Sequence, residues 1–328
     1  MEEKQLYPLR FIPIEDNYVW GSEIFKIADL GYRDTIVASG WLAANEMSEV
    51  MDTYMDRVSG EGPFGTYGRQ FPVQLKSIVC KGKMPIRVHP DDEIADQRYD
   101  ALGKEKLWYI ASAGADAKLY LGWKEQLDAT KVIESAKDGS LPSYLNIVTP
   151  KAGECFRIRP GVVHGCEGNL EIVEVSQSSA LDFCLYSWGK QVGDEEFDAS
   201  MSIVEALDFI DYGAYRSLNL PASTKNGMKD LIGIPQFTAR KIELSDPLHI
   251  SGGDSFAIYL CLYGEAAVQV DIEGLGDTEY VIKRGECLLV PAEVDDFILK
   301  PLQQTTSVME VFVETHPAKK SEEAENDR

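Results

Sequence analysis

Three short segments of this chain are the most informative about its fold: IRVHPDD at residues 86–92, GKEKLWY at residues 103–109 and RPGVVHG at residues 159–165. The chain around the first two reads mostly as short β-strands, up to about residue 122. The stretch FPVQLKSIV at residues 71–79 alternates apolar and polar side chains, a pattern typical of a half-buried strand. A weaker alternation follows in KLYL at residues 118–121.

The later part of the chain repeats this organisation. A second group of strands is expected from Gly153 to Trp188, and a third from about Phe237 to Val313. In the third group, YLCLYGEA at residues 259–266 and IKRGECLLVPA at residues 282–292 give strands, Gly turns and an apolar strand that ends in Pro. This pattern is typical of a cupin, a small double-stranded β-helix barrel related to the jelly roll. The sequence therefore predicts a mainly β protein with two cupin-like barrels.

A few segments interrupt the strands. Gly and Pro are frequent between residues 60 and 68, which predicts a loop. Asp128 can cap a helix that Gly139 ends, so we expect a small helical insertion at about 125–146. A second helix is expected over about 195–212, because four apolar residues share one helical face: Ile203, Ala206, Leu207 and Ile210.

These segments predict a division into domains. An N-terminal cupin domain is expected over 1–194, and a helical connector over 195–235. A C-terminal cupin-like β domain is expected over 236–316. The tail over 317–328 is polar, charged and without periodicity, which predicts disorder.

The composition argues against two classes of partner. The 328 residues carry a formal net charge of -22, which disfavours nucleic acid and anionic membranes because phosphates attract clustered Lys and Arg. No apolar run reaches the ~20 residues of a spanning helix, and the N-terminus lacks the apolar region of a signal peptide. The six scattered cysteines form no Cys-x-x-Cys pair and are expected to be buried thiols. We therefore expect a cytoplasmic protein.

In their order and spacing, the three segments resemble those of the type I phosphomannose isomerases. These zinc enzymes interconvert mannose 6-phosphate and fructose 6-phosphate, and their segments read Gln-x-His-Pro-x-Asp, then Gly-Lys-x-Glu-x-Trp, then a His after a Pro-Gly turn. Further matches are Trp20-Gly21, Phe71 to Lys76, Glu171 to Trp188 and Gly285 to Ala292. The resemblance implies the cupin fold and a sugar or sugar phosphate as the small-molecule partner.

The resemblance also implies a zinc site that is half missing. The family holds zinc with Gln, His, Glu and His, and the matching positions here are Arg87, His89, Lys106 and His164. Arg has no lone pair to offer a metal, and Lys coordinates only after losing a proton whose pKa is ordinarily ~10.4. His89 and His164 are the metal positions that are kept. We therefore expect a degenerate zinc site and no bound cofactor, although the family uses zinc.

Replacement ligands are the alternative. Glu105 lies one residue before the family's Glu position, and successive side chains of a strand point to opposite faces, so we expect it to face away. Cys166 and Glu167 follow His164 closely and could be improvised ligands. An active zinc isomerase that uses such ligands is therefore the second interpretation.

The resemblance assigns roles outside the metal positions as well. Lys104 and Cys184 are the candidate catalytic residues. Cys184 stands where the family has an Arg thought to help the proton transfer between C1 and C2. A fixed cation attracts a phosphate as a metal does, but it does not lower the pKa of a bound hydroxyl as a metal does. The candidate ligand-binding residues are Lys76, Arg87, Lys106 and Gln177.

The sequence therefore favours a mannose-6-phosphate isomerase-like protein with weak or no isomerase activity and a retained sugar or sugar-phosphate pocket. A pocket that has lost its function, with its cations merely filling space, also stays open, because a fold alone does not imply a working site.

Overall fold

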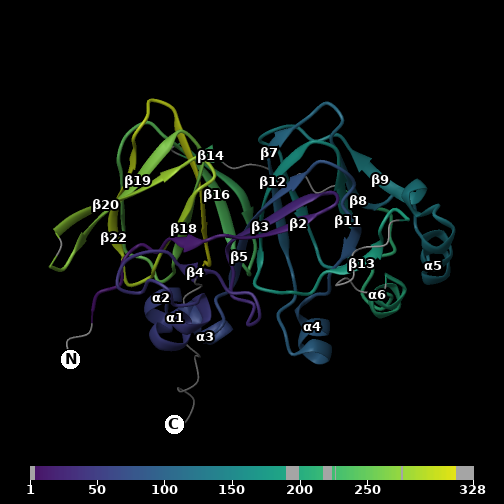
Figure 1. Ribbon diagram of the computed structural model, residues 1–328, viewed down its shortest axis with the longest axis horizontal. Helices are drawn as coiled ribbons and strands as arrows, with labels where there is room; N and C mark the ends of the chain where they lie inside the picture. The colour runs from purple at the N-terminus through teal and green to yellow at the C-terminus, as the bar shows by residue number, and fades with distance from the viewer. Residues whose placement is uncertain (1–3, 190–198, 217–223, 226, 275, 315–328) are drawn as a thin grey trace, which may run out of the picture.

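The computed structural model describes residues 4–189, 199–216, 224–225, 227–274 and 276–314. Two β barrels lie side by side, one built from strands up to β13 and the other from strands β14 to β23 (Figure 1). The prediction of a mainly β protein with two cupin-like barrels is therefore confirmed. Among the described residues, no helix is long and apolar enough to cross a membrane.

The first barrel consists of two antiparallel sheets, with strand orders β10-β7-β12-β5-β3-β2 and β13-β6-β11-β8-β9. The strands of the larger sheet are β2 Ile14–Tyr18, β3 Gly21–Ile27, β5 Val73–Cys80, β7 Lys106–Ala113, β10 Cys155–Ile158 and β12 Leu170–Gln177. Those of the smaller sheet are β6 Ile86–Val88, β8 Lys118–Trp123, β9 Leu145–Val148, β11 His164–Glu167 and β13 Phe183–Tyr186. A separate pair joins β1 Phe11–Ile12 to β4 Ile36–Val37.

The second barrel also has two antiparallel sheets, with strand orders β14-β15-β16-β23-β18-β21 and β17-β22-β19-β20. The larger sheet contains β14 Thr224–Lys225, β15 Met228–Gly233, β16 Thr238–Leu244, β18 Ala257–Tyr263, β21 Cys287–Val290 and β23 Thr306–Phe312. The smaller contains β17 Leu248–Ser251, β19 Glu265–Ile272, β20 Gly276–Lys283 and β22 Asp296–Pro301.

The central strands of the large sheet of the first barrel, β5, β7 and β12, are largely buried on both faces. Leu75 on β5 and Leu107 on β7 belong to one apolar core that also includes residues of the second barrel. The alternate residues point into the first barrel, so that Gln74 and Lys76 are only 1% and 3% exposed. The sequence predicts a strand at residues 71–79 with one face exposed to solvent. The strand is present, but the expected exposure is wrong, because the second barrel covers that face.

Helices in the first quarter of the chain correct the expectation of strands and a loop there. They are α1 Met47–Tyr54, α2 Asp56–Ser59 and α3 Glu61–Tyr67, and they lie beneath the second barrel in Figure 1. The loop predicted at residues 60–68 is mostly α3. Gly and Pro are weak helix formers, but the Asp254 carboxylate of the second barrel accepts hydrogen bonds from the first backbone N–H groups of α3, those of Glu61 (2.6 Å) and Gly62 (2.9 Å). A tertiary contact therefore caps this helix.

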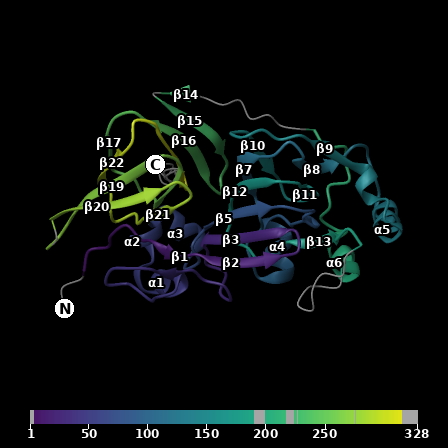
Figure 2. The ribbon, with the colours of Figure 1, turned by 45° about the horizontal axis from the view of Figure 1, so that its top comes forward.

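The other helices lie on the first barrel. α4 Asp92–Tyr99 begins after Asp91, whose carboxylate accepts the Ile94 N–H at 2.9 Å. α5 Ala129–Asp138 and the short η1 Leu141–Tyr144 form the insertion predicted at about 125–146, and α5 has Asp128 as its cap and a left-handed Gly139 at its end, as expected. Figure 2 places α5 and α6 at the end of the first barrel that is remote from the second.

The connector differs from its prediction. Only α6 Ala199–Ala206 is helical in the described part of 195–235, and β14 and β15 extend the large sheet of the second barrel. The N-terminal segment also departs from a simple division at residue 194, because the backbones of Leu9 and Leu289 exchange hydrogen bonds of 2.7 and 2.9 Å. The other predicted boundaries stay predictions, and the tail over 317–328 lies outside the described residues.

Candidate functional site

The four positions that match the family's metal ligands come together inside the first barrel. Arg87 lies on β6 and His89 directly after it, Lys106 begins β7 and His164 begins β11. Arg87 and His164 are direct partners in the sheet register, and the rings of His89 and His164 have centroids 5.1 Å apart. Both imidazoles are fully buried and Lys106 is 1% exposed.

The Lys106 ammonium lies among the groups that would hold a metal. Its Nζ donates to Asp182 Oδ1 at 2.6 Å and lies 3.1 Å from His164 Nε2. The other ring nitrogen, His164 Nδ1, is 3.0 Å from the Val162 carbonyl oxygen. A carbonyl only accepts, so Nδ1 carries the ring proton and Nε2 offers its lone pair to Lys106. A cation of the chain therefore contacts two of the groups that would hold a metal.

The charges of these buried groups follow from desolvation and from their neighbours. Burial lowers the pKa of Lys106 to about 8, although Asp182 and Glu174 oppose this change. Burial and the Lys106 charge lower the pKa of His164 to about 3, and the same two causes lower the pKa of His89 well below its usual range. At neutral pH both imidazoles are therefore neutral beside a lysine that is mostly protonated.

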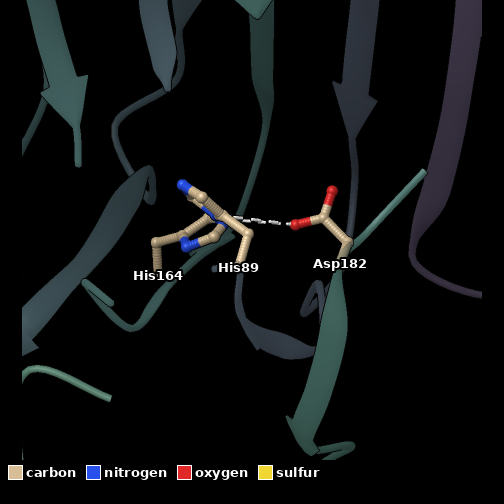
Figure 3. Close-up of side chains that lie close together, drawn as sticks. All are labelled: His89, His164 and Asp182. Atoms are coloured by element: carbon tan, nitrogen blue, oxygen red, sulfur yellow. Dashed lines mark ion pairs between the residues drawn. The ribbon is translucent and has the colours of Figure 1, made fainter. Parts of the chain in front are cut away.

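Asp182 is the site residue that sequence reasoning missed. It precedes β13, and its Oδ1 lies 3.8 Å from His89 Nδ1 and 3.9 Å from His164 Nε2 (Figure 3). These three side chains form a group whose ligand atoms lie within 4.8 Å of one another. Asp182 lies inside the matched stretch from Glu171 to Trp188, but no local pattern marks it as a site residue, and only the barrel brings it to the histidines.

Three carboxylates and four cations form one buried network. Lys76 lies 3.3 Å from Glu23 and 3.2 Å from Glu174, and Arg87 lies 2.7 Å from Glu23. The remaining members of the network are Lys104, Lys106 and Asp182. Burial alone would raise the pKa of Glu174, but Lys106 and Lys76 lower it to about 2. Four cations (Lys76, Arg87, Lys104, Lys106) against three carboxylates (Glu23, Glu174, Asp182) leave one positive charge.

A cavity of about 200 Å³ opens beside this network. Four of the predicted site residues line it, namely Lys76, Arg87, Lys104 and Cys184. Asp182 also lines it and connects it to the deeper Lys106, which is not itself a lining residue. The cavity is smaller than the ~300–1,000 Å³ usual for drug-sized ligands, so it suits a small molecule.

Two predicted residues have different surroundings from those expected. Gln177 is not among the lining residues of this cavity, and both ends of its amide are engaged: Oε1 accepts the Glu105 N–H at 2.9 Å and Nε2 donates to Asp92 at 2.8 Å. Gln177 therefore joins the start of α4 to the residue that precedes β7. Lys104 faces the cavity, but its Nζ donates to Asp182 Oδ2 at 2.9 Å.

The three replacement ligands considered from the sequence make other contacts. Glu105 turns away from the histidines, as expected, and binds Arg157 through both carboxylate oxygens at 2.7 and 3.1 Å. The Cys166 thiol lies 3.6 Å from the Met84 sulfur. Glu167 accepts hydrogen bonds from Tyr120 and Lys118. Asp182 is thus the carboxylate that the fold adds to the two histidines.

The chemistry of the donor set gives a test of metal binding. Two imidazoles and a carboxylate are groups that zinc accepts. However, the lone pairs of His164 Nε2 and Asp182 Oδ1 are both directed at the Lys106 ammonium. His89 has two buried ring nitrogens without a hydrogen-bond partner among the described residues. The set therefore does not fit zinc while Lys106 keeps its proton and its position, because two of the three donors are already engaged.

Comparisons with known proteins give one consistent group of relatives. No family model matches the chain. The mannose-6-phosphate isomerase of Streptococcus mutans is 23% identical over 223 residues, which cover 67% of this chain and 68% of that protein. A mannose-6-phosphate isomerase of Bacillus subtilis is 24% identical over 320 residues, covering 89% of this chain and 96% of that protein.

Solved structures agree with these relatives. The crystal structure of the mannose 6-phosphate isomerase from Bacillus subtilis matches with a TM-score of 0.79 at 19% sequence identity. The match covers 93% of this chain and 99% of that one. At this identity, the structural likeness demonstrates a shared fold over almost the whole chain.

Proposed function

Because the chain belongs to the mannose-6-phosphate isomerase family, we propose that it binds a sugar phosphate in the cavity of its first barrel and has weak or no isomerase activity. The single observation that carries this proposal is the Lys106 ammonium, which engages His164 and Asp182 in the place where a metal would be held. The ammonium keeps a positive charge in the barrel without the chemistry of a metal.

Binding is supported by the charges around the cavity. Lys76, Arg87 and Lys104 all line it, and the network to which they belong has one positive charge in excess. A phosphate group is attracted by such an excess, and guanidinium and ammonium groups are the usual donors to its oxygens. The cations are partly neutralised by Glu23 and Asp182, so we expect moderate rather than tight binding.

Weak turnover is supported by what the site lacks. Aldose–ketose isomerisation needs an electrophile that polarises the carbonyl and a group that moves the proton. Lys106 is 1% exposed and donates to Asp182, so its ammonium is not directed at the cavity. Cys184 stands at the cavity wall in place of the family's Arg. Lys106 therefore does not supply the electrophile, and Cys184 does not supply the Arg that the family uses in the proton transfer.

Thermal unfolding with ligands tests the binding proposal. Ligand that binds only the native state stabilises it by about 2.7 kcal/mol at 100 times its Kd. We expect a rise in Tm with mannose 6-phosphate or inorganic phosphate, and a smaller rise with mannose. Arg87→Gln should reduce the rise, whereas Arg284→Gln, on a side chain that is 60% exposed and outside the cavity, should not. Equal shifts with mannose and with its phosphate would contradict the proposal.

An active zinc isomerase is the second candidate, and the group of His89, His164 and Asp182 favours it. Elemental analysis of the purified protein and a coupled isomerase assay separate the two. The first candidate requires little zinc and slow turnover. Near-stoichiometric zinc that disappears in His164→Ala, together with kcat in the usual ~1–10³ per second, would establish the second.

A further inference from the structure

The second barrel contains a cavity of its own, of about 210 Å³. It is large enough for several water molecules, each of which takes about 30 Å³ in the liquid. No residue of the network in the first barrel lines it. Any ligand held there would therefore occupy a different site from the proposed sugar-phosphate cavity.

Three polar side chains form a row across one wall of this cavity. Arg240 on β16 pairs in the sheet register with Glu310 on β23, and Glu310 pairs with Tyr259 on β18. The Tyr259 hydroxyl donates to Glu310 Oε1 at 2.6 Å. The three lie on adjacent strands and all line the cavity, so the sheet presents them as a single surface.

This row has hydrogen-bonding capacity that the protein does not use. Arg240 Nε is 3.5 Å from Glu310 Oε2 and 3.6 Å from Asp230 Oδ1, beyond the usual 2.7–3.2 Å of an N–H···O bond. The same nitrogen is buried and has no hydrogen-bond partner in the part of the chain that the structure describes. Burial raises the pKa of Glu310. A buried donor left without an acceptor is costly unless a ligand or solvent oxygen satisfies it.

The surroundings of the row select among ligand chemistries. Phe256 and Phe297 line the cavity and are buried, and the Arg240 guanidinium lies over the Phe312 ring, 4.5 Å from its centre. Arg240 and Glu310 carry opposite charges, so the wall favours neither an anion nor a cation. A neutral molecule with adjacent hydroxyls can accept from Arg240, donate to Glu310 and place its apolar face against the rings.

We propose that the second barrel has a separate binding site for a small neutral polyhydroxylated molecule of monosaccharide size, held by Arg240, Glu310 and Tyr259. This site and the cavity of the first barrel are expected to bind different ligands. The first cavity lies beside an excess positive charge and is proposed to bind a phosphate. The two barrels of one chain thus present a charged and a neutral pocket of similar volume.

Ligand-detected NMR on the full chain, with D-mannose and D-glucose as probes, tests this proposal. We expect weak binding to the native protein that falls about tenfold or more in Arg240→Met, because a hydrogen bond from a charged group is lost. Ala257→Leu, which fills the cavity while keeping the polar row, should reduce binding similarly. Arg284→Gln, on a side chain that is 60% exposed and lines neither cavity, is the control and should leave neutral-sugar binding unchanged.

The outcomes distinguish the two proposed sites. Arg240→Met and Ala257→Leu should keep the stabilisation by mannose 6-phosphate, which also verifies that both variants are folded. The proposal is overturned if neither neutral sugar binds the native protein at millimolar concentration. It is equally overturned if neutral-sugar binding keeps its native affinity in both second-barrel variants or is lost in Arg284→Gln.

Discussion

Removal of the Lys106 ammonium is the most direct perturbation of the buried network. In Lys106→Met the chain keeps a side chain of similar length but loses the contacts to Asp182 (2.6 Å), His164 (3.1 Å) and Glu174 (4.0 Å). Lys106 and Glu174 are each 1% exposed, so the remaining charges cannot recover their hydration. Breaking a buried ion pair by removing one partner costs about 3–5 kcal/mol.

The expected loss lies at the lower end of that range. Asp182 keeps Lys104 at 2.9 Å, and Glu174 keeps Lys76 at 3.2 Å and the Trp108 indole N–H at 2.6 Å. We therefore expect a loss of about 3 kcal/mol in the free energy of unfolding. At 2–4 °C per kcal/mol for a domain of about 150–250 residues, Tm should fall by roughly 6–12 °C.

Urea denaturation of the two proteins measures this loss. The matched control is Lys118→Met, since Lys118 is 43% exposed and pairs with Glu167 at 3.3 Å. Such exposed pairs contribute less than about 1 kcal/mol. A loss in Lys106→Met no larger than that in Lys118→Met would refute the reasoning, because it would mean that the ammonium is not a member of a buried network.

Three further predictions follow from the same site and from the contact between the barrels. Arg87→Gln combined with Lys106→Glu should raise zinc affinity by orders of magnitude, because neutral and anionic donors replace cations; zinc titration of the folded variant checks this. The His164 pKa is lowered from 6.5 to about 3, so the unfolded chain binds a proton that the native chain does not, and stability falls as pH decreases across that window. His164→Gln should flatten this dependence by about 1.4 kcal/mol per pH unit, as measured by urea unfolding at each pH. Gly60→Ala should lower the free energy of unfolding by about 2 kcal/mol, because Gly60 has φ +97° and a Cβ there would lie 2.5 Å from a carbonyl oxygen of the second barrel. Gly68→Ala is the control, and it should lower the free energy of unfolding by less in the same urea assay, because Gly68 has φ +62° but no atom within 4 Å of the position that a Cβ would take.

The sequence was sufficient for the architecture because strands and turns depend on local residue patterns. Alternation, Gly turns and the matched motifs predicted the two barrels, and Asp128 and Gly139 fixed the ends of the inserted helix. Local patterns failed at α3, whose Gly and Pro residues predict a loop, because the cap is supplied by Asp254 of the other barrel. They also failed on the connector, where β15 forms by pairing with β16.

At the site, the sequence determined which residue types occupy the metal positions, and so predicted that two cations replace two ligands. The charge balance was decided only by the tertiary structure. By sequence alone, Arg87 and Lys106 place two positive charges at the metal positions, whereas the fold surrounds them with Glu23, Glu174 and Asp182. These carboxylates come from β3, β12 and the segment before β13, and no local pattern relates them. The reason is physical: burying an ammonium is costly without partner charges, and only the closed barrel brings those partners within contact distance.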